Sequence, residues 1–126
     1  DTNDVPLSGA TFLLEGSEDG SLWYPVIPGP NGVCVLDERS EENLAAASKT
    51  SGEDGLLTWE NLSITLQYRI TETKAPEGYT LLKEAAFEGT LPADTLELRV
   101  VNGEAFTLPK TGSVGFVRIP MATVFV

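Results

Sequence analysis

The stretch ITLQYRITETKAPEGY, residues Ile64–Tyr79, decides how this 126-residue chain folds. Its first half alternates apolar with polar side chains, which is the period-two pattern of a strand with one buried face. The next residue in the apolar phase after Ile70 is Glu72, and a carboxylate is costly to bury unless it is protonated, hydrogen-bonded or paired. Two alternatives follow: the strand ends and Glu72 turns into water, or Glu72 stays in line with the buried row.

A second predicted strand, residues 96–101, ends in the same way. Its apolar positions are Leu96, Leu98 and Val100, and the next residue on the same face is Asn102. Two strands therefore each finish an apolar row with a polar side chain, a Glu in one and an Asn in the other. This second case favours the alternative in which Glu72 stays in the buried row.

Several motifs are shared with a known family. SGEDGLLTWENL at 51–62, followed by YRITETKAPEGYTL at 68–81, resembles the CnaB or SpaA-type, prealbumin-like domains of Gram-positive pilins and surface adhesins. The opening PLSGATFLL at 6–14 resembles the first segment of that family, and LPKTG at 108–112 is similar to its cell-wall sorting signal. The resemblance implies an all-β, Ig-like Greek-key sandwich over residues 1–104, followed by a sorting tail over 105–126.

The rest of the chain fits a β-sandwich, because short apolar runs alternate with turn signals about every ten residues. Ala10–Glu15 is predicted as a strand with Phe12 and Leu14 facing inward. The runs 22–27 and 33–36 predict a hairpin in which Pro25 favours an edge position. Acidic residues, alanines and a lysine in succession predict one short helix over Glu41–Ala47.

Composition excludes several classes of function. The chain has 8 Lys and Arg against 19 Asp and Glu, a net charge of −11, whereas nucleic-acid binding needs a basic surface. It has no histidine, so Ser-His-Asp or Cys-His catalysis and histidine-bound metal are excluded. The single cysteine, Cys34, forms no intrachain disulfide and is read as a small hydrophobe rather than a reactive thiol. We expect no enzyme activity, cofactor or metal.

The LPKTG motif is a substrate motif, formed by Leu108, Pro109, Lys110, Thr111 and Gly112. Pro109 fixes its own φ and biases the preceding residue to an extended conformation. The resemblance implies that a sortase cysteine attacks the Thr111 carbonyl and releases Gly112 onward. An amine from a peptidoglycan precursor or a neighbouring pilin subunit then resolves the acyl-enzyme.

The tail after Gly112 is apolar and looks like the opening of the family's membrane anchor. From Gly115, 12 residues remain, which as a helix span roughly 18 Å against a hydrocarbon thickness of about 30 Å. This stretch alone is therefore too short to cross a bilayer.

The resemblance also implies an internal crosslink. Family members join a first-strand lysine to a last-strand Asn or Asp, with ammonia expelled from Asn and a buried Glu assisting. By position, Glu72 is the assisting acid and Asn102 the acceptor. Burial favours a neutral amine and a protonated acid, which can polarise the amide carbonyl and carry protons.

None of the chain's lysines, which are Lys49, Lys74, Lys83 and Lys110, lies in the first strand. We expect that strand to be truncated here, and this fragment to contain no isopeptide bond.

The function expected from these residues is that of a structural stalk or anchor domain. The parent protein would be an extracellular, cell-wall-anchored pilin or adhesin of a Gram-positive bacterium, with sortase as partner. The alternative is an adhesin module that binds a host surface ligand through the Leu22–Leu36 hairpin or the acidic segment Asp37–Lys49. Paired carboxylates such as Glu53 and Asp54 are too generic to support an enzyme.

Overall fold

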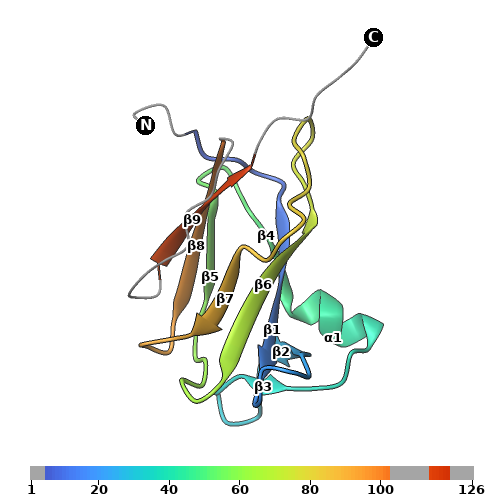
Figure 1. Cartoon of the computed structure of the whole chain (residues 1–126), viewed down its shortest axis with the longest axis vertical. Coiled ribbons are helices and arrows are strands. Elements are labelled where there is room, and N and C mark those ends of the chain that lie inside the picture. Colours follow the sequence, from blue (N-terminus) through green and yellow to red (C-terminus); the bar gives the residue numbers. More distant parts are fainter. Residues whose placement is uncertain (1–4, 103–113, 120–126) are drawn as a thin grey trace.

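Two β-sheets face each other in the computed structural model, which describes residues 5–102 in full and residues 114–119 as backbone (Figure 1). Within these residues the larger sheet has the order β3-β2-β1-β6-β7, with β4 also paired to β1, and the smaller has the order β5-β8-β9. The strands are β1 (Thr11–Ser17), β2 (Tyr24–Ile27), β3 (Val35–Leu36), β4 (Ser48–Thr50), β5 (Leu56–Trp59), β6 (Gln67–Lys74), β7 (Phe87–Thr90), β8 (Leu96–Asn102) and β9 (Val114–Ile119). The predicted all-β sandwich is confirmed.

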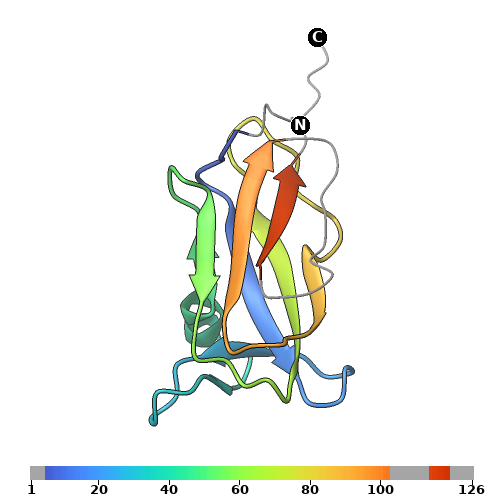
Figure 2. The same ribbon diagram turned by 90° about the vertical axis from the view of Figure 1, so that its left-hand side faces the viewer.

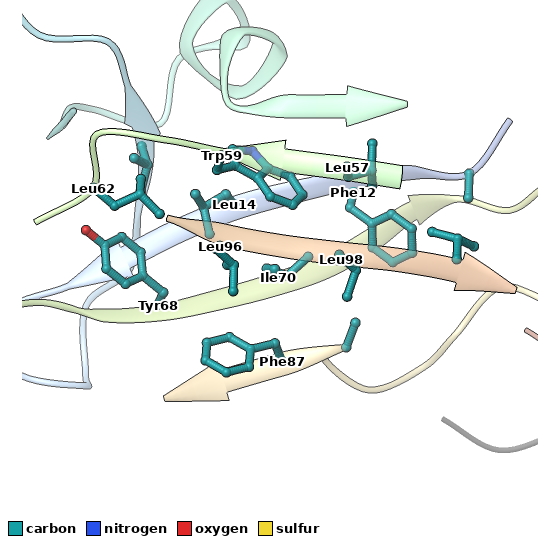
Figure 3. Packing of buried hydrophobic residues seen from close by; sticks show 14 of the residues in the cluster. Phe12, Leu14, Leu57, Trp59, Leu62, Tyr68, Ile70, Phe87, Leu96 and Leu98 are labelled. Carbon is teal, nitrogen blue, oxygen red and sulfur yellow. The ribbon is translucent and has the colours of Figure 1, made fainter. Parts of the chain in front are cut away.

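The hydrophobic core fills the space between the two sheets (Figure 3). Alternate residues of β6 and β8 are buried, as their period-two patterns predict. Burial of each large apolar side chain contributes about 1.5–3 kcal/mol, so the two facing rows contribute substantially to the stability of the fold. The core includes Phe12, Leu14, Leu57, Trp59, Tyr68, Ile70, Phe87, Leu96 and Leu98.

The one helix among the described residues, α1 (Glu41–Ala46), lies beyond β1 and β2, away from the smaller sheet (Figure 1). It begins at Ser40, whose Oγ accepts a hydrogen bond from the backbone N–H of Asn43 at 3.1 Å. A serine cap and acidic residues in the first turn both stabilise a helix N-terminus. The helix predicted over Glu41–Ala47 is therefore confirmed.

The edge position expected for Pro25 is wrong, because β2 lies between β1 and β3. The predicted hairpin itself is present, with Val26 opposite Leu36. Pro25 is tolerated because it lies where the β2–β3 pairing ends. Its carbonyl accepts the N–H of Asp37 at 3.2 Å, and because proline has no N–H, only the hydrogen bond from Pro25 back to Asp37 is missing.

The strand predicted to be the last, β8, is followed by another. Residues 114–119, expected as the opening of a membrane anchor, form β9 and pair with β8 in parallel. Figure 2 shows the two strands side by side with their arrowheads at the same end. Val, Phe and Ile suit a strand as well as an apolar helix, so composition alone does not separate the two. Within the described part of the chain, no helix is long and apolar enough to cross a membrane.

Candidate functional site

Glu72 stays in the buried row of β6. Tyr68, Ile70 and Glu72 are all buried, and the exposed fraction of Glu72 is 3%. The alternative in which Glu72 turns into water is therefore wrong. The strand continues to Lys74 and pairs with β1, where Phe12 lies opposite Glu72, so the sheet holds the carboxyl group at the end of the core.

The two oxygens of Glu72 have different surroundings. Oε1 accepts the backbone N–H of Leu82 at 2.6 Å, whereas Oε2 is buried with no hydrogen-bond partner among the described residues. Burial raises the pKa of Glu72, and the Leu82 N–H opposes this only in part. A carboxyl group with one unpartnered buried oxygen and a raised pKa is suited to hold a proton and donate it.

Asn102, the last residue of β8, is half-buried. Its side-chain Oδ1 accepts the backbone N–H of Val5 at 2.9 Å, and its own N–H donates to the Val5 carbonyl at 3.0 Å. The C-terminal ends of β6 and β8 lie at the same end of the sandwich, in facing sheets (Figures 1 and 2). Glu72 and Asn102 thus share that end, although no described hydrogen bond joins them.

The lysines lie elsewhere in the described structure. The Lys49 ammonium donates to the Thr58 carbonyl at 2.7 Å and lies 6.0 Å from the centre of the Trp59 ring. Lys74 is the exposed final residue of β6, and Lys83 is exposed in the loop that follows. No described ion pair or hydrogen bond joins these three lysines to Glu72 or Asn102. Lys110 and the rest of the motif 108–112 lie outside the described residues.

Sequence reasoning missed a buried ionic cluster on the outer face of β1. Glu15 is 2% exposed and forms ion pairs with Arg39 and Arg69, the latter at 2.9 Å. Arg69 also stacks on Trp23, with its guanidinium carbon 4.5 Å from the ring centre. Glu15 lies out of phase with Phe12 and Leu14, which predicts a solvent-facing side chain. The sequence feature that could have indicated this cluster was Arg69, a cation within a predicted strand. In the structure Arg69 lies opposite Glu15 on β6.

Other candidate chemistry is weak. Cys34 is half-buried, packs against the core and has its thiol pKa raised by burial, as fits a small hydrophobe. Over the described residues, no three Cys, Asp or Glu side chains come together in a way that could hold a metal ion. Glu72 and Asn102 therefore remain the candidate site.

Residues 1–104 match the model of the SpaA family, described as a prealbumin-like fold domain. The chain belongs to this family. The match covers the whole sandwich up to two residues past the end of β8, and so includes both Glu72 and Asn102 of this SpaA domain.

The SpaA domain is also similar to the crystal structure of a group B streptococcus pilus 2b backbone protein. The two share 22% sequence identity and superpose with a TM-score of 0.58 over 94% of this chain. The matched part is 37% of the streptococcal chain, so this domain spans little more than a third of that protein. The likeness confirms the fold. A comparison with curated protein sequences gave no match.

Proposed function

We infer that this SpaA domain is a structural stalk or anchor module of an extracellular Gram-positive pilus or surface protein, attached to the cell wall by a sortase. One observation carries the proposal: LPKTG begins six residues after Asn102, where β8 ends. A transpeptidation motif that closely follows β8 in the sequence would attach the covalent link to the strand through which tension would enter the sheet.

The proposed reaction balances without a cofactor. A sortase thiolate attacks the Thr111 carbonyl, the Thr111–Gly112 amide breaks, and the Gly112 amine leaves with a proton. The amine of a peptidoglycan precursor or of a neighbouring pilin lysine then attacks the thioester, forms a new amide and restores the thiol. The SpaA domain supplies only the acyl group, so its own residues need no catalytic role in anchoring.

Incubation of the chain with a sortase and a glycine-based amine tests this step. Mass spectrometry should show loss of residues 112–126 and gain of the amine. Thr111→Ala should abolish the product. Lys110→Ala is the matched control and should retain the product, because the family motif leaves that position variable. An unmodified wild-type chain would contradict the proposal.

The crosslink is a separate part of the proposal. Glu72 would protonate the Asn102 amide while a lysine Nζ attacks its carbonyl carbon; the new amide forms and ammonia leaves. The buried Oε2 of Glu72 and the shared end of β6 and β8 support these roles. This chain should show its full sequence mass. A version extended at its N-terminus with a lysine-bearing strand should lose one ammonia, and should not do so with Glu72→Ala or Asn102→Ala.

A second candidate function, binding of a host ligand, is favoured by one cavity. A cavity of about 650 Å³ lies between the β2–β3 hairpin and the turn at 63–66, a volume in the range of ligand sites. Its walls combine apolar side chains with three carboxylates and no cation: Glu18, Tyr24, Cys34, Val35, Leu36, Asp37, Glu38, Ser63, Thr65 and Leu66.

Binding of the chain to immobilised matrix proteins and glycans tests this candidate. Tyr24→Ala and Val35→Ala, at exposed positions of the cavity, should weaken any specific binding. Leu81→Ala is the control, because Leu81 is a similarly exposed apolar residue outside the cavity. Equal effects of all three variants would argue against the cavity.

A further inference from the structure

Strand β8 has two edges, and the first is closed by the body of the domain. The N–H of Val100 donates to the Gly55 carbonyl at 2.7 Å, and the Val100 carbonyl accepts the N–H of Leu7 at 3.0 Å. The N–H of Asn102 donates to the Val5 carbonyl on the same edge. The backbone groups of even-numbered β8 residues therefore face β5 and the segment 5–7.

Among the described residues, the second edge of β8 is closed by β9 alone. Successive backbone groups of a strand point to opposite edges, so those of Glu97, Arg99 and Val101 face β9. The pairing runs in parallel without interruption from Glu97 opposite Val114 to Asn102 opposite Ile119. In this register the N–H groups of Gly115, Val117 and Ile119 face β8, and those of Phe116 and Arg118 face away.

Every residue of β9 lies on the C-terminal side of the Thr111–Gly112 bond. While that bond is intact, a short connection keeps β9 near β8 at an effective concentration on the order of millimolar. Once it is cut, the same strand is a separate peptide at its bulk concentration. A pairing of six residues along one edge is too small to survive that dilution at micromolar protein.

We propose that the β9-facing edge of β8 is a strand-acceptor site for an extended peptide, occupied in the uncut chain by its own β9 and vacated when the chain is cut after Thr111. Where copies are held side by side at a local concentration on the order of millimolar, the vacated site takes the segment Val114–Ile119 of a second copy, the sequence that already pairs in register in the uncut chain. The release step rests on the proposed sortase reaction, whereas the acceptor site rests only on the observed pairing.

An open strand edge with unpaired N–H and C=O groups is a template for another strand. Cutting would therefore expose the edge only in copies that are already anchored, while uncut copies keep it closed. This gives the covalent step a structural consequence, because β8 of a cut copy can compete with β8 of a neighbouring uncut copy for the β9 of that uncut copy.

Hydrogen exchange of the full-length chain, read residue by residue by NMR, tests the acceptor site without a sortase. Val117→Pro removes an N–H that faces β8, whereas the matched control Arg118→Pro removes one that faces away and is tolerated on an edge strand. In Val117→Pro, the amides of Glu97, Arg99 and Val101 should exchange roughly tenfold faster or more. Those of Leu98, Val100 and Asn102 should be unchanged, which also shows that the variant is folded.

The second arm adds a synthetic peptide of residues 112–120, at a concentration on the order of millimolar, to Val117→Pro and to the sortase-cut chain. The peptide should restore slow exchange at the odd-numbered β8 amides. Equal exchange at odd and even positions in Val117→Pro, or no protection by the peptide, would overturn the proposal. If the sortase fails to cut, only the proposed anchoring reaction is contradicted, because the Val117→Pro measurements do not use it.

Discussion

The backbone N–H of Leu82 donates to Oε1 of Glu72 at 2.6 Å, and this is the only described hydrogen bond to a carboxyl group buried at the end of the core. Leu82 comes from the loop that follows β6, so the loop and the strand meet at this carboxyl. One oxygen is satisfied and the other, Oε2, has no described partner, which leaves the charged form poorly compensated.

The first prediction concerns the pH dependence of stability. Burial raises the pKa of Glu72 above its ordinary value of 4.5 in the folded state. The folded state therefore binds the proton more tightly than the unfolded state, and the free energy of unfolding falls as pH rises through the folded pKa. The Glu72→Gln side chain does not ionise, so the free energy of unfolding of this variant should not fall over this pH range. It should match wild type near pH 4 and exceed it by about 1 kcal/mol near pH 8, measured by urea unfolding.

Glu84→Gln is the control, because Glu84 is exposed in the same loop. Its unfolding free energy should follow wild type at both pH values. A difference between Glu72→Gln and wild type that is the same at both pH values would show that burial does not perturb this group.

Much of the fold followed from local patterns. The period-two rows of β6 and β8 placed Glu72 and Asn102 at the ends of buried strands because alternation is a property of the strand itself. The helix followed Ser40 and the acidic residues after it, since a cap acts within one turn. Each of these features depends on residues close in sequence.

The features that escaped prediction depend on distant partners. Glu15 is buried because Arg39, from a later segment of the chain, lies over the outer face of β1 and forms an ion pair with it. The alternation of apolar and polar residues does not predict such a long-range contact. The pairing of β9 depends on the free edge of β8, and its apolar composition suits an anchor equally well. Whether Glu72 and Asn102 act together was set by resemblance, and their roles stay predictions.

The second prediction concerns Gly55. Its φ is +70°, and a Cβ there would lie 2.4 Å from the Val100 carbonyl oxygen. Since β8 is paired along both edges, its backbone cannot retreat, and Gly55→Ala should cost on the order of 3 kcal/mol. Gly32→Ala, at a φ of +82° with nothing within 4 Å, should cost only about 1 kcal/mol. Equal losses in thermal or urea unfolding would show that φ, rather than the close contact, decides.

The third prediction concerns Ser51, which ties the N-terminal segment to β1. Its buried Oγ donates to the Leu7 carbonyl at 2.7 Å and accepts the N–H of Ala10 at 3.1 Å. Ser51→Ala leaves both groups unpaired in the interior and should lower the unfolding free energy by about 2 kcal/mol. Ser63 lies in a turn, and its described hydroxyl hydrogen bonds are only to Thr65, so Ser63→Ala should change the unfolding free energy by less than about 0.5 kcal/mol. Similar effects of the two would contradict the role of Ser51.

The last prediction concerns the buried cluster around Glu15. Arg69→Met leaves the Glu15 carboxylate buried with only Arg39, which is half-exposed, and also removes the stack on Trp23. The buried charge of Glu15 is then compensated by a half-exposed arginine alone, so a loss of about 3 kcal/mol is expected. Arg39→Met should cost about 1 kcal/mol, because Arg69 still pairs with Glu15 through a strand neighbour.

The double variant Glu15→Leu with Arg69→Met separates the value of the pair from the cost of breaking it. Apolar replacement of both partners removes the buried charge together with its need for compensation, and such replacements are often neutral or stabilising. The double variant should therefore be more stable than Arg69→Met alone in urea unfolding. If it is instead less stable than Arg69→Met, the Glu15 carboxylate stabilises the fold even without Arg69, and its burial is more than compensated by Arg39.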